Sequence, residues 1–339
     1  MDKHPEDISK NDKKYKKKKK KFSWKILTAF IIFEIIFTGV TAPFIAYYGP
    51  FQNVKVTLVG SAMTTLSHQW IATTFLSQER IDKILGKQAV ETIKQDVNAT
   101  DIKLPKKHDE NIEREDIHVP GKFKGYMLIV HDPTRVKVGY TKKLYTEGQL
   151  TSEIARDNDA VAAINGGSFE DTNGGKKWTG TGANPKGLIL ADGKIIHNDL
   201  VEGEDRDMMA LTKEGKLLVG HYTVEELMKL GATEAVSFGP ALVVNGKKVP
   251  VDAWGNAPRT CIGQREDGAI LMLVTDGRKL TELGATLEDI QDVMIKYGAI
   301  NATNLDGGSS STMYYEGEVI NTPSDSLGER TGASAVYVK

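Results

Sequence analysis

The sequence predicts an α+β domain built on a mixed β-sheet with few helices, preceded by one N-terminal transmembrane helix. Short apolar runs of strand character recur from about residue 126 to the C-terminus, and turns such as Asn245-Gly246 separate them. Only three segments there have helical spacing, and strands and helices do not alternate regularly, which argues against a doubly wound parallel sheet. The apolar stretch from Trp24 to Tyr48 is long enough to cross a bilayer.

The first 48 residues divide by charge. Residues 1–22 form a basic tail with an unbroken lysine run at 16–21, and residues 23–48 form the apolar anchor. Lysines beside a span stay in the cytoplasm, so we expect a single-pass membrane protein with a cytoplasmic N-terminus and an extracellular C-terminal domain. A cleaved signal peptide is the alternative, since Val40-Thr41-Ala42 offers small residues for cleavage. The apolar stretch is longer than the usual signal-peptide core of ~7–15 residues.

Residues 49–110 are expected to form a partly helical extracellular stalk or linker. Apolar residues between Ile71 and Val97 have helical spacing. A charged segment with a proline, residues 103–116, marks the boundary of the domain at 111–339.

Within that domain, the periodicity places strands and three helices. The expected strands contain residues 126–130, 135–138, 160–164, 187–190, 194–196, 208–211, 217–219, 241–244, 261–262, 269–274, 313–315, 319–320 and 335–338. The expected helices span residues 149–158, 223–230 and 286–297. The last two begin at a threonine with an acid three residues later, which is the pattern of a capping box.

Composition excludes several classes of function. The chain has 44 Lys and Arg against 45 Asp and Glu, so its charge does not predict a nucleic-acid partner. The single cysteine, Cys261, excludes an internal disulfide. Seven histidines without a His-x-His or His-x-x-x-His pair argue against a transition-metal site. No cofactor is expected, although Ca²⁺ or Mg²⁺ on Asp276 or Asp306 stays open.

The stretch from Asn301 to Met313 has the composition of a polar site. A carboxylate, Asp306, is followed by Gly307 and Gly308 and then by the four hydroxyls of residues 309–312. The glycines allow turns and close backbone approach to a ligand, and a loop between a helix and a strand can hold these groups toward it. A serine-rich connector is the alternative explanation.

Four further positions carry chemistry of the same kind. Asn165-Gly166 follows an apolar strand, Asp276 and Arg278 close another, Arg259-Thr260 open a third, and Arg330 precedes the last. The guanidinium group of arginine suits a phosphate. Each position taken alone is also explained by a turn or a surface ion pair.

Six short motifs occur in order along residues 112–339. They are Asn165-Gly-Gly-Ser-Phe169, Phe238-Gly-Pro-Ala-Leu242, Arg259-Thr-Cys-Ile-Gly263, Leu273-Val-Thr-Asp-Gly-Arg278, Asn304-Leu-Asp-Gly-Gly-Ser-Ser310 and Glu329-Arg330. In residue type and order they resemble the successive motifs of the phosphodiester glycosidase family. The anchor and stalk resemble the membrane-tethered Gram-positive members often labelled exopolysaccharide biosynthesis proteins.

The resemblance implies a hydrolase that cleaves the glycosidic C–O bond of a sugar-1-phosphodiester. The expected substrate is a cell-surface polysaccharide or teichoic-acid type glycopolymer, from which free sugar is released and a phosphomonoester is left. The catalytic carboxylate is expected to be Asp306, then Asp276, then Glu170. Groups expected to bind phosphate or sugar are Arg259, Arg278, Arg330, Asn165, Gly166, Thr260, Asn304, Gly307, Gly308, Ser309 and Ser310.

Two other functions stay open on the same residues. A non-catalytic carbohydrate-binding or assembly protein would hold a sugar-phosphate polymer without releasing reducing sugar. A metal-dependent phosphodiesterase would cut the P–O bond and would be sensitive to EDTA.

Overall fold

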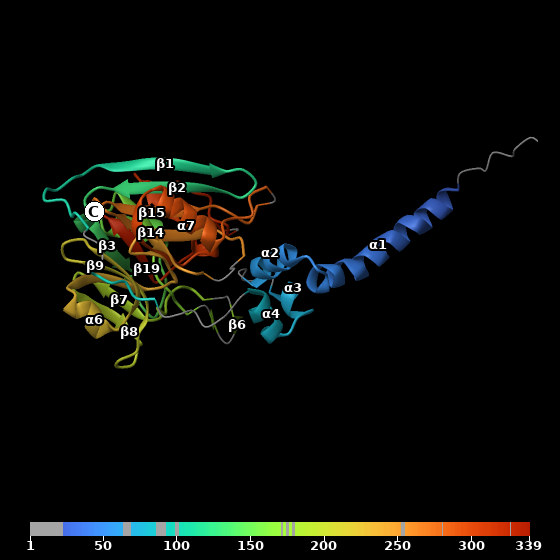
Figure 1. Ribbon diagram of the computed structural model, residues 1–339, viewed down its shortest axis with the longest axis horizontal. Coiled ribbons are helices and arrows are strands. Elements are labelled where there is room, and N and C mark those ends of the chain that lie inside the picture. The colour runs from blue at the N-terminus through green and yellow to red at the C-terminus, as the bar shows by residue number, and fades with distance from the viewer. Residues whose placement is uncertain are drawn as a thin grey trace, which may run out of the picture. The chain divides into compact units, whose positions relative to one another are not determined.

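The computed structural model (Figure 1) describes residues 23–339 except 64–68, 86–92, 99–101, 171, 174–175, 178–179, 252–254, 280 and 326. The chain divides into two compact units, Met1–Gly49 and Pro50–Lys339. Sheets dominate the second unit and helices are few, so the predicted α+β class is confirmed.

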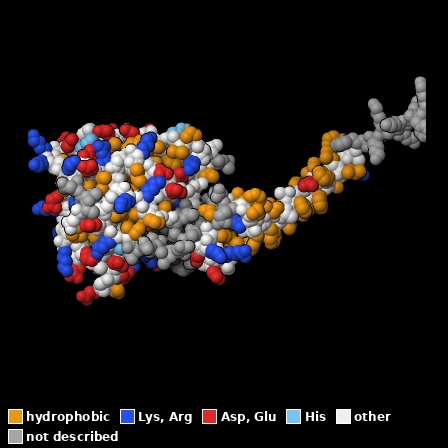
Figure 2. Space-filling model, in the orientation of Figure 1, with side chains coloured by type: hydrophobic (Ala, Val, Ile, Leu, Met, Phe, Trp, Pro, Cys, Tyr) orange, Lys and Arg blue, Asp and Glu red, His pale blue; other side chains and the backbone are white. Residues whose placement is uncertain are grey.

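The first unit contains the helix α1 (Trp24–Tyr48), and the predicted basic tail lies outside the described residues. This helix has 25 residues and a mean hydropathy of 2.0 in its most apolar window, so it is long and apolar enough to cross a membrane. Figure 2 shows apolar side chains exposed along it. A membrane anchor and an N-terminal signal sequence share these properties.

Three sheets make up most of the second unit. Seven strands lie in the order β1 (Ile112–Val119), β2 (Phe123–Val130), β15 (Ile270–Thr275), β14 (Arg259–Arg265), β16 (Ala299–Leu305), β12 (Ala241–Val244) and β13 (Lys247–Lys248). A second sheet has the order β10 (Leu217–Tyr222), β9 (Arg206–Thr212), β11 (Ala232–Ser237), β7 (Leu188–Ala191) and β8 (Lys194–Asn198). The third has the order β18 (Glu318–Val319), β17 (Met313–Tyr315), β4 (Ala162–Asn165), β19 (Ser334–Val338) and β3 (Val136–Tyr140).

A short hairpin and two 3₁₀ turns complete the strand-rich part. The hairpin pairs β5 (Thr172–Asn173) with β6 (Lys176–Lys177), and the turns are η1 (Pro133–Arg135) and η2 (Gly308–Ser310). All pairings between the strands named here are antiparallel. The sheets therefore differ from the sequence prediction in strand direction, since a mixed sheet contains parallel pairs as well.

The three sheets share one central core. Along β15, Ile270, Met272 and Val274 belong to this core, whereas Leu271 and Leu273 belong to a second cluster on the opposite face. This is the period of two expected of a strand, and both faces are apolar because both are covered. The continuous apolar runs in the sequence are therefore strands buried on both sides.

One helix covers the outer face of each sheet. α7 (Leu287–Lys296) packs on the seven-stranded sheet, α6 (Val224–Lys229) on the second sheet and α5 (Thr151–Asp157) on the third. The capping boxes predicted at Thr223 and Thr286 are both present, with each threonine hydroxyl accepting from the backbone N–H three residues later. The three helices of the prediction are thus confirmed.

The segment before the domain is less helical than the sequence indicates. It contains α2 (Gln52–Met63), α3 (Trp70–Thr73) and α4 (Gln78–Leu85), and residues 86–92 lie outside the described part. The predicted helix to Val97 is wrong at its end, because Lys94 pairs with Gly220 at the edge of β10 and residues 97–98 form a turn. There Gln95 Oε1 accepts from Val219 N at 3.0 Å. The bonds of a sheet edge outweigh the local helical spacing.

Apart from the two-residue strands β5, β6 and β13, three strands do not appear in the sequence prediction. β1 is an exposed edge strand with four charged residues in succession, and such charges hide its pairing pattern. β11 is short and contains a buried glutamate, Glu234, which accepts from Val138 N at 2.9 Å. β16 carries buried polar side chains, among them Asn301, whose Oδ1 accepts from Asn245 N at 2.9 Å. The first half of the expected polar loop is therefore a central strand.

Candidate functional site

The predicted site residues lie where strand ends from two sheets meet. β14 begins at Arg259 opposite Thr275, the end of β15, and Thr260 lies opposite Leu305, the end of β16. Antiparallel register therefore brings the loops after β15 and β16 to one edge of the seven-stranded sheet. The end of β4, at Asn165, joins them from the third sheet.

Asn165 ties these strand ends together. Its Oδ1 accepts from Thr260 Oγ1 at 2.7 Å and from Thr312 N at 3.1 Å, and its Nδ2 donates to Asp306 O at 2.5 Å. Asn165 and Thr260 are both buried. Their polar atoms thus position the backbone of Asp306.

Two glycines of the site are required by close approach. A Cβ on Gly166 would lie 2.6 Å from Ser334 Oγ, and Gly166 O accepts from Asp306 N at 3.2 Å. Gly308 has φ +64, and a Cβ there would lie 2.9 Å from Arg278 Nη2. Any side chain at position 308 would both strain the backbone and displace the guanidinium.

The amides of this glycine loop already have partners. Gly307 N donates to Asp306 Oδ1 at 2.9 Å, and Gly308 N donates to Pro258 O at 2.8 Å. These bonds fix the turn and the Asp306 carboxylate, and both amide donors are used within the protein.

Three arginines converge beside this loop. Arg259 is buried, with Nε donating to Ala285 O at 3.1 Å and Nη2 to Gly255 O at 2.6 Å. Arg278 is half-buried at φ +59, and its Nη1 lies 3.4 Å from Ser324 Oγ. The Arg330 guanidinium lies 5.0 Å from the centre of the Phe169 ring, and its Nη2 donates to Gly180 O at 3.3 Å.

Burial, and after it the repulsion between neighbouring cations, lowers the pKa of two of these arginines. Burial, followed by the charge of Arg278, lowers the pKa of Arg259 to about 10. The pKa of Arg278 is also lowered, by burial first and by Arg330 second, while Asp306 and Asp325 raise it. Both arginines stay protonated at pH 7, so the folded protein holds positive charge where charge is disfavoured. Perturbed charges of this kind cluster at binding and catalytic sites.

The three predicted carboxylates have different surroundings. Asp306 is half-buried and acts on Arg278 electrostatically. Asp276 is 1% exposed, and its Oδ1 accepts from Thr322 N at 2.8 Å and from Asn321 Nδ2 at 3.4 Å. Glu170 is half-buried on the loop after β4, where its backbone N–H donates to Asn184 O at 2.7 Å.

A row of buried polar side chains follows β16. Asn304 Nδ2 donates to Gly239 O at 3.0 Å, and after the strand Ser309 and Ser310 are buried as well. Four buried atoms of this row have no hydrogen-bond partner among the described residues: Asn304 Oδ1, Ser310 Oγ, Ser311 Oγ and Thr312 Oγ1. Buried polar atoms nearly always find partners, so this row has spare capacity for water or for the hydroxyls of a ligand.

Sequence reasoning missed the turn from Asn321 to Asp325. Asn321 Oδ1 accepts from Met313 N at 2.7 Å and its Nδ2 donates to Ser311 O at 3.0 Å, while Ser324 and Asp325 act on Arg278. The segment Thr322-Pro-Ser-Asp325 shows only turn composition, and no local signal places it against Arg278.

No metal centre forms among the residues that the structure describes. Within them, no group of three or more His, Cys, Asp or Glu side chains comes together in a way that could hold a metal ion. Cys261 is fully buried, and burial raises its pKa, which makes its thiol a poor nucleophile.

Comparison with known proteins yields a family and a fold. The family model for phosphodiester glycosidase matches residues 158–339. The chain is 30% identical over 206 residues to the SPbeta prophage-derived uncharacterized protein YomE of Bacillus subtilis, covering 58% of this chain and 30% of that protein. It is 23% identical over 193 residues to human N-acetylglucosamine-1-phosphodiester alpha-N-acetylglucosaminidase, covering 51% of this chain and 35% of the human protein.

The chain thus spans about a third of the length of these two relatives. Among solved structures, the zebrafish N-acetylglucosamine-1-phosphodiester alpha-N-acetylglucosaminidase catalytic domain, auto-inhibited by its pro-peptide, matches with a TM-score of 0.56 at 21% identity. The match covers 67% of this chain and 82% of the zebrafish chain. At this identity the match shows a shared fold.

Proposed function

This chain belongs to the phosphodiester glycosidase family, and we propose that it hydrolyses the glycosidic C–O bond of a sugar-1-phosphodiester. The observation that carries the proposal is the convergence of Arg259, Arg278 and Arg330 beside Asp306. Arginines gathered at one place repel each other, and a bound phosphodiester offsets that repulsion through charge-assisted hydrogen bonds.

The arginines have different parts in this proposal. The Arg259 guanidinium is buried and donates to the carbonyl oxygens of Ala285 and Gly255, so we assign it an electrostatic part without direct contact to the phosphate. Arg278 and Arg330 are less buried than Arg259, and Arg278 lies against the glycine loop that follows Asp306, so we assign these two the contact with the phosphate. Their charge also stabilises the phosphate as it leaves.

Asp306 is the carboxylate assigned to the chemistry. Water attacks C1 of the sugar, a bond forms from the water oxygen to C1, and the bond from C1 to the phosphate oxygen breaks. The electron pair stays on the phosphate, which leaves as a phosphomonoester, and Asp306 takes the proton of the attacking water. Asp276 instead keeps the 321–325 turn against Arg278 through its bonds to Asn321 and Thr322.

The substrate class in this proposal is a cell-surface glycopolymer of the exopolysaccharide or teichoic-acid type. Its support is the apolar helix Trp24–Tyr48 together with the lysine run before it, which favour a membrane anchor and an extracellular domain.

The test uses the full chain in detergent with UDP-N-acetylglucosamine, and phosphorus and proton NMR identify the products. Free sugar with a phosphomonoester, lost in Asp306→Asn and kept in Asp267→Asn, supports the proposal. Asp267 is an exposed acid on the turn after β14 and serves as the matched control. Release of sugar-1-phosphate would mean that the P–O bond is cleaved, and loss of that activity in EDTA would indicate a metal-dependent phosphodiesterase. Binding without turnover would indicate a non-catalytic carbohydrate-binding or assembly protein.

A further inference from the structure

An exposed aromatic ring, Tyr145, is fixed on the surface at an energetic cost. Its residue is 60% exposed, and its backbone has φ +65, a conformation that bulky side chains rarely adopt. Such strain persists only where the surroundings enforce it. Neither the core nor the candidate site described above uses this side chain.

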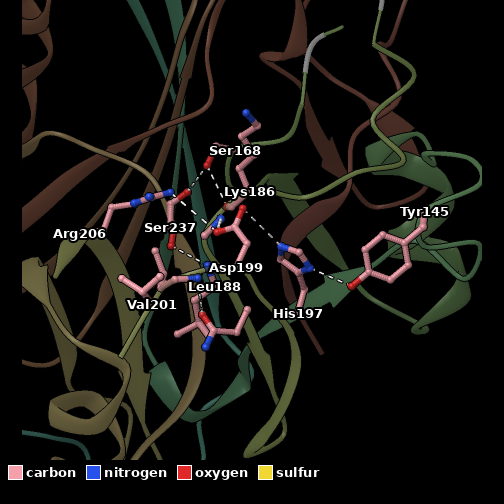
Figure 3. A network of polar contacts seen from close by, with 12 residues as sticks. Tyr145, Ser168, Lys186, Leu188, His197, Asp199, Val201, Arg206 and Ser237 are labelled. Atoms are coloured by element: carbon pink, nitrogen blue, oxygen red, sulfur yellow. Dashed lines mark hydrogen bonds and ion pairs between the residues drawn. The ribbon is translucent and has the colours of Figure 1, made fainter. Parts of the chain in front are cut away.

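A polar network holds the Tyr145 ring in place (Figure 3). Its phenol oxygen lies 2.8 Å from His197 Nδ1, and the two ring centres are 5.8 Å apart. The His197 side chain is only 11% exposed, and its Nε2 lies 3.9 Å from Asp199 Oδ2. Asp199 Oδ1 in turn accepts from Gly187 N at 2.7 Å, so the network ends in the backbone before β7.

The backbone of Tyr145 rests on the segment that also holds the arginine site. Tyr145 N donates to Ala183 O at 2.8 Å, and Arg330 Nη2 donates to Gly180 O at 3.3 Å. The three chain steps from Gly180 to Ala183 span at most ~10 Å. Tyr145 therefore lies one short chain segment away from the guanidinium group assigned to the phosphate.

Close glycine contacts make this connection rigid. A Cβ on Gly148 would lie 2.3 Å from Thr181 O, and a Cβ on Gly182 would lie 2.6 Å from Gly332 Cα. The loops around residues 148, 181 and 332 are therefore pressed together at backbone level. An aromatic ring carried on them keeps its position relative to Arg330.

We propose that Tyr145 is a stacking platform for a second sugar unit of the substrate, beyond the unit whose bond is cleaved. This inference rests on the proposed function and adds that the substrate is a polymer. Sugar rings present an apolar C–H face that packs on an aromatic ring, and tyrosine offers this area with little conformational entropy to lose. A ring fixed before binding loses still less, so the strain at Tyr145 is offset by preorganisation.

The experiment compares two ligands on the full chain in detergent by isothermal titration calorimetry. One is the methyl phosphodiester of N-acetylglucosamine 1-phosphate, and the other is a synthetic trimer of N-acetylglucosamine 1-phosphate repeats. All proteins carry Asp306→Asn, so that neither ligand is consumed. We expect the trimer to bind about tenfold more tightly than the methyl diester, which corresponds to ~1.4 kcal/mol.

Tyr145→Ala should remove most of that tenfold advantage and change the affinity for the methyl diester less than about twofold. Tyr145→Phe keeps the ring and should keep most of the advantage. Tyr140→Ala, at an aromatic residue of β3 that is 38% exposed, is the matched control and should change neither affinity.

Two outcomes would overturn the proposal. One is an unchanged affinity of Tyr145→Ala for the trimer. The other is an equal loss of affinity for both ligands, which would mean that the ring stabilises the site without contacting a second sugar. Failure of the proposed function is detected separately. It would appear as no turnover of the methyl diester by the wild-type chain, and the binding comparison would still decide the role of Tyr145.

Discussion

Replacing Arg278 by methionine should make the protein more stable while weakening its binding of phosphate. The Arg278 cation is disfavoured in the folded state, by burial first and by Arg330 second. For the more deeply buried Arg259, the fall in pKa to about 10 corresponds to roughly 3 kcal/mol, at 1.36 kcal/mol for each unit. Arg278 is less buried, so the gain there should be smaller.

The opposing loss includes the 3.4 Å bond to Ser324 Oγ, which methionine cannot make, and a hydrogen bond of ordinary geometry contributes only about 0.5–1.5 kcal/mol. It also includes the attraction of Asp306 and Asp325 for the guanidinium, which is weaker than the effect of burial. The aliphatic part of the side chain is kept. A net gain of 1 kcal/mol would raise Tm by about 2–4 °C in a domain of this size.

The assay is thermal unfolding followed by circular dichroism, in sodium phosphate and in sodium chloride of equal ionic strength. Phosphate at a hundred times its Kd stabilises the native state by ~2.7 kcal/mol, so the wild type should melt at a higher temperature in phosphate. Arg278→Met should melt at a higher temperature than the wild type in chloride and gain little from phosphate. Arg278→Lys should keep part of the phosphate effect, and Arg114→Met, at an arginine of the edge strand β1, should keep all of it.

A lower Tm in chloride for Arg278→Met, combined with an undiminished phosphate effect, would refute this reasoning. It would mean that Arg278 stabilises the fold and that the anion binds elsewhere.

Three further predictions concern the surroundings of the site and the fold. Gly308→Ala should lose activity and about 1–2 kcal/mol of stability, because alanine is strained at φ +64 and its Cβ meets Arg278 Nη2; unchanged kcat/KM would contradict this. Thr286→Ala should cost about 1 kcal/mol in urea unfolding through the lost N-cap of α7, and Thr286→Ser should restore most of it. Burial raises the pKa of Asp207 above 3.8, so the native state binds more protons and stability falls as pH rises from about 3.8 through the folded pKa. Asp207→Asn should lack that fall and be more stable than the wild type at pH 7, and an equal dependence on pH in both proteins would refute it.

The fold could be predicted where local patterns and tertiary packing agree. Strands such as β15 are continuous apolar runs, and α6 and α7 begin at capping boxes written in the sequence. The sequence does not predict β1, because its successive charges hide its pairing with the adjacent β2. It does not predict β16, because the strands that pair with β16 are distant in the chain. In β16 the Oδ1 of the buried Asn301 accepts from a backbone N–H 56 residues away, which no local window contains.

The candidate site could be predicted as a set of motifs but not as a division of roles. Asp276 and Asp306 each follow an apolar strand and precede a glycine. The sequence can therefore rank them as catalytic candidates only by the residues around them. Their roles stay predictions, and the structure separates their surroundings. The Asp276 carboxylate is buried against Asn321 and Thr322, whereas Asp306 is half-buried beside Arg278.

Burial and hydrogen-bond partners also distinguish the roles of the remaining polar residues of the site. The hydrogen bonds of Asn165 with Thr260 and Asp306 link the ends of β4, β14 and β16, and this linkage holds the backbone of Asp306 at a fixed position. Arg278 and Arg330 lie in loops beyond the strand ends, where the sheets do not dictate their positions. A sheet edge that fixes one carboxylate, with cations on adjoining loops, lets the loops adapt to different phosphodiesters while the reacting group stays in place. By this argument, substitutions at Asn165 or Thr260 should lower kcat for every substrate, whereas substitutions in the 321–330 loop should change which substrate is preferred.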